Sequence, residues 1–160
     1  AIDLNPKFAE AYYFRGVTKG ALQDNTGAIA DYNKAIELNP KNAEAYYFRG
    51  VTKGVLQDYI GAIADNTKAI ELNPKNVKAY YNRGLVKDSL KDYTGAIADY
   101  NKAIELKSKF AEAYNNRGLA KYKLKQKDYM KDLEKAKDLY LEQGDNDEYK
   151  KTIDIINRLR

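Results

Sequence analysis

The stretch "NPKNAEAYYFRGVTKG" occupies residues 39–54, and the stretch "NPKFAEAYYFRGVTKG" occupies residues 5–20 of the same 160-residue chain. Extended to residues 5–38 and 39–72, the two segments differ at six positions only: 8/42, 21/55, 25/59, 26/60, 32/66 and 33/67. Two looser copies follow further along the chain. A fixed period of 34 residues predicts a repeat protein, in which each unit buries its apolar face against its neighbours.

Each repeat predicts a pair of helices joined by a short turn. In the second repeat, residues 43–56 contain few helix breakers, and residues 59–72 carry apolar side chains at helical spacing. Proline at positions 6, 40 and 74 cannot continue a helix, so each Asn-Pro pair marks a boundary between repeats. The short turns make the two helices antiparallel. Residues suited to capping a helix N-terminus precede several of the predicted helices: Asp24, Asn42, Asp58, Asn76 and Asp92.

The residue types present exclude most enzyme chemistry. The chain has no cysteine and no histidine, which removes thiolate nucleophiles and the commonest general base and metal ligand. Ser89 and Ser108 are its only serines, and no glycine-rich phosphate-binding loop is present. The acidic residues are spread singly and not at calcium-loop spacing. We therefore expect no enzymatic activity, no catalytic residue, no bound metal and no cofactor.

The distribution of apolar residues is that of a soluble protein. No apolar run approaches the length of a membrane span, and the first residues do not resemble a signal peptide. A chain without cysteine is viable in any compartment, so the compartment stays open, with a cytoplasmic location favoured.

Aromatic and small residues recur at fixed positions of the repeats. With Ala9 as position one, tyrosine fills position four, glycine position eight, and alanine positions twenty and twenty-seven. These residues are Tyr12, Tyr46, Tyr80 and Tyr114; Gly16, Gly50, Gly84 and Gly118; Ala28, Ala62 and Ala96; and Ala35, Ala69, Ala103 and Ala136. The pattern resembles the tetratricopeptide repeat family over most of the chain. The resemblance implies an all-α fold, a right-handed superhelical solenoid of antiparallel helix pairs with a C-terminal capping helix.

The resemblance divides the chain into repeats at residues 7–40, 41–74, 75–108 and 109–142, of which the fourth is a variant with a shortened turn. Residues 1–6 align with "AIELNP" at 35–40, so we interpret them as the tail of a truncated preceding repeat. We expect the N-terminal end to be cut and the native C-terminal end to be present.

A further helix is predicted over residues 145–160. Gly144 is a natural helix stop, and Asp145 and Glu148 form a capping-box arrangement. Tyr149, Ile153 and Ile156 then lie on one helical face, as in the extra helix that seals many such arrays.

Two positions of the repeat depart from the family pattern. Position seven, usually leucine, is arginine, and position eleven, usually tyrosine, is lysine. Because an unpaired charge between two helices is costly, we predict an arginine–aspartate pair in each repeat. The alternative is that each arginine lays its stem on the helix and keeps its head in water. The predicted structural residues are Arg15 with Asp31, Arg49 with Asp65, and Arg83 with Asp99, and their fourth-repeat equivalents are Arg117 and Asp132.

The resemblance also implies that the first helix of each repeat lines a concave groove, which binds a segment of a partner protein. Position five carries a ladder of tyrosines that ends in Asn115, position nine stays apolar throughout, and position six changes from Phe14 and Phe48 to Asn82 and Asn116. Tyrosine suits recognition because it combines a large apolar ring with a hydrogen-bonding tip. The alternative is that these tyrosines only pack between adjacent helices. The predicted peptide-binding residues are Tyr13, Val17, Tyr47, Val51, Lys78, Tyr81, Asn82, Leu85, Asn115, Asn116, Leu119 and Tyr122.

The expected function is that of a protein-interaction scaffold or adaptor. The net charge of +5 comes from residues 69–136 and could attract an acidic peptide, with a merely solvated surface as the alternative, while nucleic acid and membrane insertion are not expected. The carboxylate clamp with which co-chaperone members bind chaperone tails is not matched, since Tyr13 and Val17 stand at its first two positions. Two alternatives stay open: a homo-oligomer that associates through its N-terminal repeat face, and a scaffold arm of an enzyme whose catalytic domain lies outside this chain.

Overall fold

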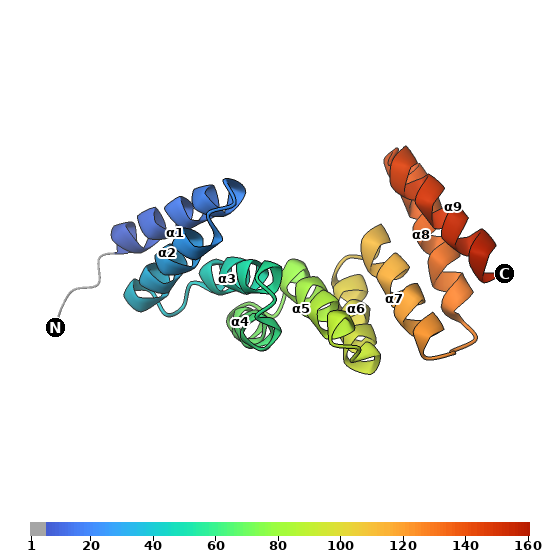
Figure 1. Ribbon diagram of the computed structural model, residues 1–160, viewed down its shortest axis with the longest axis horizontal. Helices are drawn as coiled ribbons and strands as arrows, with labels where there is room; N and C mark the ends of the chain where they lie inside the picture. The colour runs from blue at the N-terminus through green and yellow to red at the C-terminus, as the bar shows by residue number, and fades with distance from the viewer. Residues whose placement is uncertain (1–5) are drawn as a thin grey trace. The chain divides into compact units, whose positions relative to one another are not determined.

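The computed structural model describes residues 6–160, with side chains from Phe8 onward. Within this part of the chain every regular element is an α-helix, which confirms the all-α fold (Figure 1). The predicted tail at residues 1–6 lies outside the described residues except for Pro6. The helices are α1 (Pro6–Ala21), α2 (Asn25–Leu38), α3 (Ala43–Val55), α4 (Tyr59–Leu72), α5 (Val77–Ser89), α6 (Tyr93–Leu106), α7 (Ala111–Lys123), α8 (Tyr129–Gln143) and α9 (Asn146–Leu159).

The chain divides into two units, Ala1–Val86 and Lys87–Arg160, and α5 crosses the division. In the first unit α1 packs against α2, α2 against α3, and α3 against α4. In the second unit α6 packs against α7, α7 against α8, and α8 against α9. Helices that follow one another in the sequence are therefore neighbours in space within each unit, as their short connections require.

An aspartate cap closes the turn within each of the first three helix pairs. Asp58 accepts a hydrogen bond from the backbone N–H of Gly61 at 3.0 Å, which satisfies one of the free donors at the start of α4. A Cβ on Gly61 would lie 2.1 Å from the carboxylate of Asp58, so a larger residue would displace the cap. The predicted caps are thus confirmed: Asp24 and Asp92 bind the N–H groups of Gly27 and Gly95 in the same way, and Asn42 and Asn76 accept from Ala45 and Ala79.

The turn of the fourth helix pair differs from the other three. α7 ends at Lys123 and α8 begins at Tyr129, so five residues connect them, whereas three connect α3 to α4. The loop is longer because the first turn of the second helix is not helical here. Between equivalent residues the chain is one residue shorter, in keeping with the predicted shortening: Arg117 and Asp132 are fifteen residues apart, whereas Arg49 and Asp65 are sixteen apart. Gln126 stands where the other turns have the capping aspartate, and Asp128 makes no side-chain cap. The carboxylate of Asp128 instead accepts a hydrogen bond from Nζ of Lys121 at 2.6 Å.

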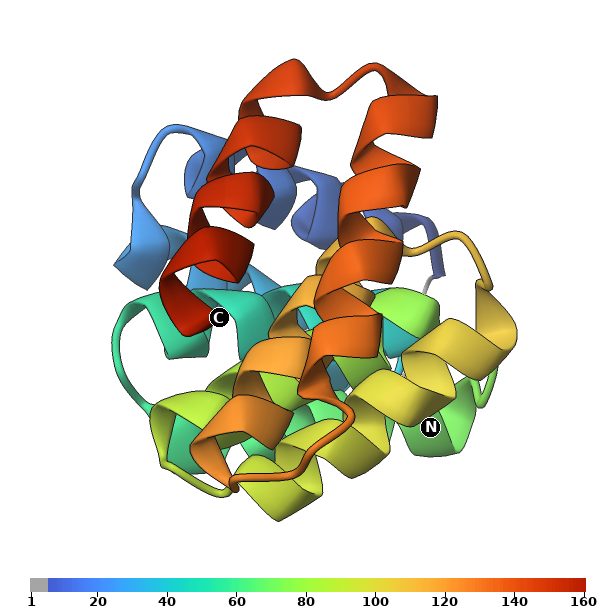
Figure 2. The ribbon, with the colours of Figure 1, turned by 90° about the vertical axis from the view of Figure 1, so that its right-hand side faces the viewer.

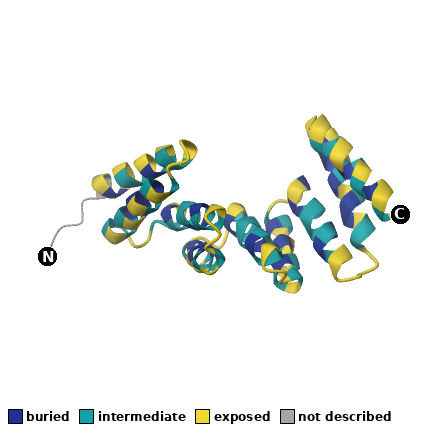
Figure 3. Ribbon diagram, in the orientation of Figure 1, coloured by how far each residue is buried: buried dark blue, intermediate teal, exposed yellow. Residues whose placement is uncertain are grey.

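Small residues allow the paired helices to approach closely. Ala28, Ala62 and Ala96 are completely buried on the second helices of their pairs. A Cβ on Gly16 would lie 2.7 Å from the ring of Tyr32, so glycine at this position makes room for a large side chain on the facing helix. Figure 3 shows buried bands that alternate with exposed ones along the helices, as expected for elements that bury one side each.

α9 closes the second unit as an additional amphipathic helix beside α8 (Figure 2). The chain turns at Gly144, whose φ of 73° is in the left-handed region that favours glycine. Asp145 caps α9 by accepting a hydrogen bond from the backbone N–H three residues later, as predicted. Ile156 is buried, and the hydroxyl of Tyr129 donates to the carbonyl of Leu159 at 2.9 Å.

Candidate peptide-binding site

A buried aspartate binds two cations in three of the repeats. In the first repeat, Arg15 donates from Nε and Nη2 to the two carboxylate oxygens of Asp31 at 2.7 and 2.6 Å. Nζ of Lys19 lies 2.9 Å from the same carboxylate. The equivalent groups are Arg49, Lys53 and Asp65 in the second repeat, and Arg117, Lys121 and Asp132 in the fourth. The structure thus contains the predicted arginine–aspartate pair in these repeats and adds a lysine to each.

The third repeat lies across the division between the two units. Lys87 and Asp99 both belong to the second unit, and their charged atoms are 2.8 Å apart. Arg83 belongs to the first unit, so its pairing with Asp99 stays a prediction.

The cations keep the buried carboxylate ionised. The hydrogen bonds from Arg15 are the main reason why the pKa of Asp31 is lowered to about 2, and Lys19 acts in the same direction against the effect of burial. The aspartate is therefore charged throughout the physiological pH range.

The arginine also joins one repeat to the preceding one. Arg49 donates from Nη1 to Oδ1 of Asn33 on α2 at 2.7 Å, and its guanidinium lies over the ring of Tyr46. Arg83 bonds Thr67 at 3.0 Å in the same way, and Arg117 bonds Asn101 at 2.7 Å. A planar group with several fixed donors can make all these contacts at once, which explains arginine at a position where the family usually has leucine.

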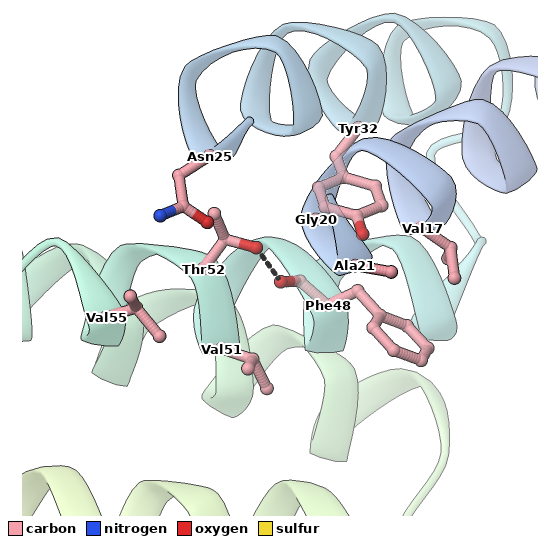
Figure 4. A pocket seen from close by; sticks show the side chains of 9 residues that line it. All are labelled: Val17, Gly20, Ala21, Asn25, Tyr32, Phe48, Val51, Thr52 and Val55. Atoms are coloured by element: carbon pink, nitrogen blue, oxygen red, sulfur yellow. Dashed lines mark hydrogen bonds between the residues drawn. The ribbon is translucent and has the colours of Figure 1, made fainter. Parts of the chain in front are cut away.

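An apolar pocket of about 300 Å³ opens between α1, α2 and α3 in the first unit (Figure 4). The hydroxyl of Thr52 donates to the carbonyl of Phe48 at 2.9 Å, so this polar group is satisfied within its own helix. A concave site with mostly apolar lining suits an apolar side chain of a ligand. The lining residues are Val17, Gly20, Ala21, Asn25, Tyr32, Phe48, Val51, Thr52 and Val55.

Aromatic rings from all three helices support this pocket. The ring of Phe48 stacks on that of Tyr32 with centroids 6.3 Å apart, and it meets the rings of Tyr13 and Tyr47 edge-on at 5.8 and 5.0 Å. Burial, followed by the charge of Glu44, raises the pKa of Tyr13 and of Tyr47. Burial raises the pKa of Tyr32 to about 12. The three tyrosines are therefore neutral phenols. Tyr13 and Tyr47, both predicted to bind peptide, pack against the ring of Phe48.

The predicted peptide-binding residues fall into separate groups. Val17 and Val51 line the pocket, and Tyr13 and Tyr47 contact its phenylalanine. The remaining eight residues lie outside this lining, and peptide contacts at all twelve residues stay predictions. The eight are Lys78, Tyr81, Asn82 and Leu85 on α5, and Asn115, Asn116, Leu119 and Tyr122 on α7.

Six lining residues were missed, although the sequence contains a signal for four of them. Ala21, Asn25, Tyr32 and Val55 stand at three of the six positions that differ between the first two repeats, namely 21/55, 25/59 and 32/66. The peptide-binding residues were predicted from positions that recur between the repeats. The few positions that differ between the first two repeats would have indicated the lining of the pocket.

The aromatic pair of the pocket is changed to two amides one repeat later. Asn66 replaces Tyr32, and Asn82 replaces Phe48. Asn66 is fully buried and donates from Nδ2 to the carbonyl of Ala62 at 2.8 Å. Its Oδ1 and the buried Nδ2 of Asn82 have no hydrogen-bond partner among the described residues. The Asn66 and Asn82 positions are therefore polar, whereas the equivalent Tyr32 and Phe48 positions one repeat earlier are apolar.

Among the residues that the structure describes, no group of three or more acidic, histidine or cysteine side chains could hold a metal ion. None of the helices in residues 6–160 is long and apolar enough to cross a membrane.

The sequence matches three profiles of one repeat family. A profile described as "TPR repeat" matches residues 20–53 and 89–125, and two described as "Tetratricopeptide repeat" match residues 43–76 and 66–98. Together these matches run without a gap from residue 20 to residue 125. A search of curated protein sequences finds no significant match.

Several solved structures share the fold. The crystal structure of MamA is 31% identical with a TM-score of 0.83, over 88% of this chain and 83% of that one. The first TPR of Spaghetti (RPAP3), bound to the HSP90 peptide SRMEEVD, is 25% identical with a TM-score of 0.75, over 78% and 98% of the two chains. The Arabidopsis OM64 TPR domain is 30% identical with a TM-score of 0.68, over 76% and 98%. With its paired helices, recurring small residues and these matches, the chain is an all-α helical repeat solenoid that belongs to the tetratricopeptide repeat family.

Proposed function

We propose that this protein-interaction scaffold binds an extended segment of a partner protein by accepting an apolar side chain in the pocket between α1, α2 and α3. The observation that carries the proposal is the pocket itself, because its lining includes two residues predicted for peptide binding, Val17 and Val51. The likeness to a repeat domain bound to an HSP90 peptide supports peptide binding as the general mode.

The pocket supplies affinity through burial of apolar surface. Transfer of a leucine-sized side chain from water into such a pocket is favourable by about 1.5–3 kcal/mol. The half-buried tyrosines beside it, Tyr13 and Tyr47, are neutral and offer hydroxyl groups to the backbone of the bound segment. An apolar anchor with backbone contacts on either side is the chemistry that this lining favours, as opposed to a terminal carboxylate held by cations.

The proposal is tested with a displayed peptide library and two matched variants. Val51→Asp places a charge in the lining, whereas Ile60→Asp makes a comparable change on α4 at a side chain that is 75% exposed. Peptides selected by the parent protein should bind Val51→Asp at least about tenfold more weakly, because a charge in an apolar site costs more than 1.4 kcal/mol. The same peptides should bind Ile60→Asp like the parent. Equal affinity for both variants would contradict the proposal.

A second candidate function is self-association through α1. Phe8 is 60% exposed and, with Ala11, Tyr12 and Arg15, lines an open pocket of about 200 Å³. At the equivalent position the second repeat has Asn42, which caps a helix. Light scattering over a range of concentrations should detect dimers that Phe8→Asn abolishes. A parent protein that stays monomeric throughout removes this candidate.

A further inference from the structure

A pocket of about 400 Å³ lies at the turn between α7 and α8, within the second unit. Gln126 stands where the other turns have the capping aspartate, and Lys127 follows it in a stretch that is turn here and helix in the other pairs, so this altered turn supplies part of the lining. The lining residues are Tyr122, Lys123, Lys125, Gln126, Lys127 and Tyr129. Three of them are lysines and none is acidic, and we call this site the basic pocket.

Two lysines of the basic pocket keep an uncompensated charge. Lys125 and Lys127 are exposed and form no ion pair with any residue in the described part of the chain. The carboxylate within the turn, that of Asp128, is already bound by Lys121 at 2.6 Å. A concave surface with positive charge and no neighbouring counter-ion attracts anionic groups.

The wall of the basic pocket is aromatic and fixed in place. The rings of Tyr122 and Tyr129 meet edge-on with centroids 5.1 Å apart. The hydroxyl of Tyr129 is held by the carbonyl of Leu159 at the end of α9. Tyr122 remains 44% exposed, so an apolar group can reach its ring. Lys123 is engaged by Asp88 at 3.1 Å and adds little free charge.

We propose that the basic pocket binds an acidic segment of a partner protein, with carboxylates at Lys125 and Lys127 and an apolar side chain of the same segment against Tyr122. A single-stranded nucleic acid would need a series of stacking rings and charges along its path. One exposed ring and two free lysines fit a short acidic segment better. The inference goes beyond the proposed function, because this site would act whether or not the apolar pocket binds a peptide.

The test uses a fluorescein-labelled peptide in which single leucines alternate with pairs of glutamates. Binding of this peptide is measured by fluorescence anisotropy at low ionic strength. Lys125→Ala with Lys127→Ala should weaken binding about tenfold, since short-range charge contacts are lost. Lys131→Ala with Lys135→Ala removes the same charge from exposed positions on α8 and should leave the affinity within about twofold of the parent. Equal losses in both double variants would mean unspecific attraction and would overturn the proposal.

The aromatic contact and the alternative ligand are tested in the same assay. Tyr122→Ala should weaken binding of the acidic peptide, and Tyr122→Phe should preserve it. Oligothymidine that binds more tightly than the peptide at equal salt would overturn the proposal in favour of a nucleic-acid site, as would failure of the peptide to bind at all. Val51→Asp should bind the acidic peptide like the parent, so that failure of the apolar pocket and failure of the basic pocket can be told apart.

Discussion

Replacement of Arg49 by leucine should destabilise the protein, although leucine is the usual residue of the family at this position. The substitution removes two hydrogen bonds to Asp65, at 2.8 and 2.6 Å, and one to Asn33 at 2.7 Å. Asp65 is only 4% exposed, so its carboxylate cannot replace these donors with water. Lys53, at 2.9 Å, remains as a counter-ion.

The magnitude follows from these contacts. Loss of one partner from a buried ion pair costs about 3–5 kcal/mol. The remaining lysine and the apolar contacts of the new leucine offset part of this, which leaves a loss of about 2–3 kcal/mol. For a chain of this size, Tm should fall by about 5–10 °C. Thermal unfolding followed by circular dichroism, with urea unfolding as a second measure, gives both quantities.

Arg15→Leu is the matched control in the first repeat. Arg15 makes the same two contacts with Asp31, but its side chain is 59% exposed, compared with 17% for Arg49. Water competes for an exposed ion pair, so this substitution should lower Tm by clearly less. The reasoning is refuted if Arg49→Leu melts like the parent, or if the two variants lose the same stability.

Three further variants test other parts of the structure. Gly61→Ala should lower stability by about 1 kcal/mol in urea unfolding, because the added Cβ would displace the Asp58 cap; an unchanged midpoint would contradict this. Asn66→Tyr with Asn82→Phe should raise stability by about 1–3 kcal/mol, since it removes two unpartnered buried polar atoms and restores the stacked pair of the preceding repeat; a less stable double variant would show that the amides are satisfied. The pKa of Asp31, lowered to about 2, predicts a contribution to stability that is complete above about pH 4 and lost as the pH falls toward 2, so the acid loss of stability should be shallower in Asp31→Asn.

The features that the sequence predicted correctly are local or repeat with the period. Asp58 and its glycine are three residues apart, and Pro40 and Pro74 lie in the short connections between successive helix pairs. The pair of Arg49 and Asp65 is separated by sixteen residues on facing helices of one hairpin, and it recurs at a corresponding place in the first and fourth repeats. A charge that recurs on an inner face requires a recurring partner, so the pairing could be inferred before any coordinates.

The features that the sequence did not predict depend on which helices come together. Lys53 joins the same aspartate, but nothing in its spacing distinguishes it from a solvated lysine. In the fourth helix pair Gln126 replaces the capping aspartate and the first turn of the second helix is not helical, which the pattern of the other repeats did not predict.

The sequence by itself determined the all-α repeat fold, the helix boundaries and the main ion pair, because these depend on a period, on capping residues and on contacts within one hairpin. Only the tertiary structure decided where the pockets lie. The apolar pocket takes residues from three helices of two repeats, and Phe48 becomes its centre because Tyr32 of the preceding repeat stacks on it. A concave site is formed by surfaces that meet after folding, and a single sequence records the residues of each surface without recording which surfaces meet.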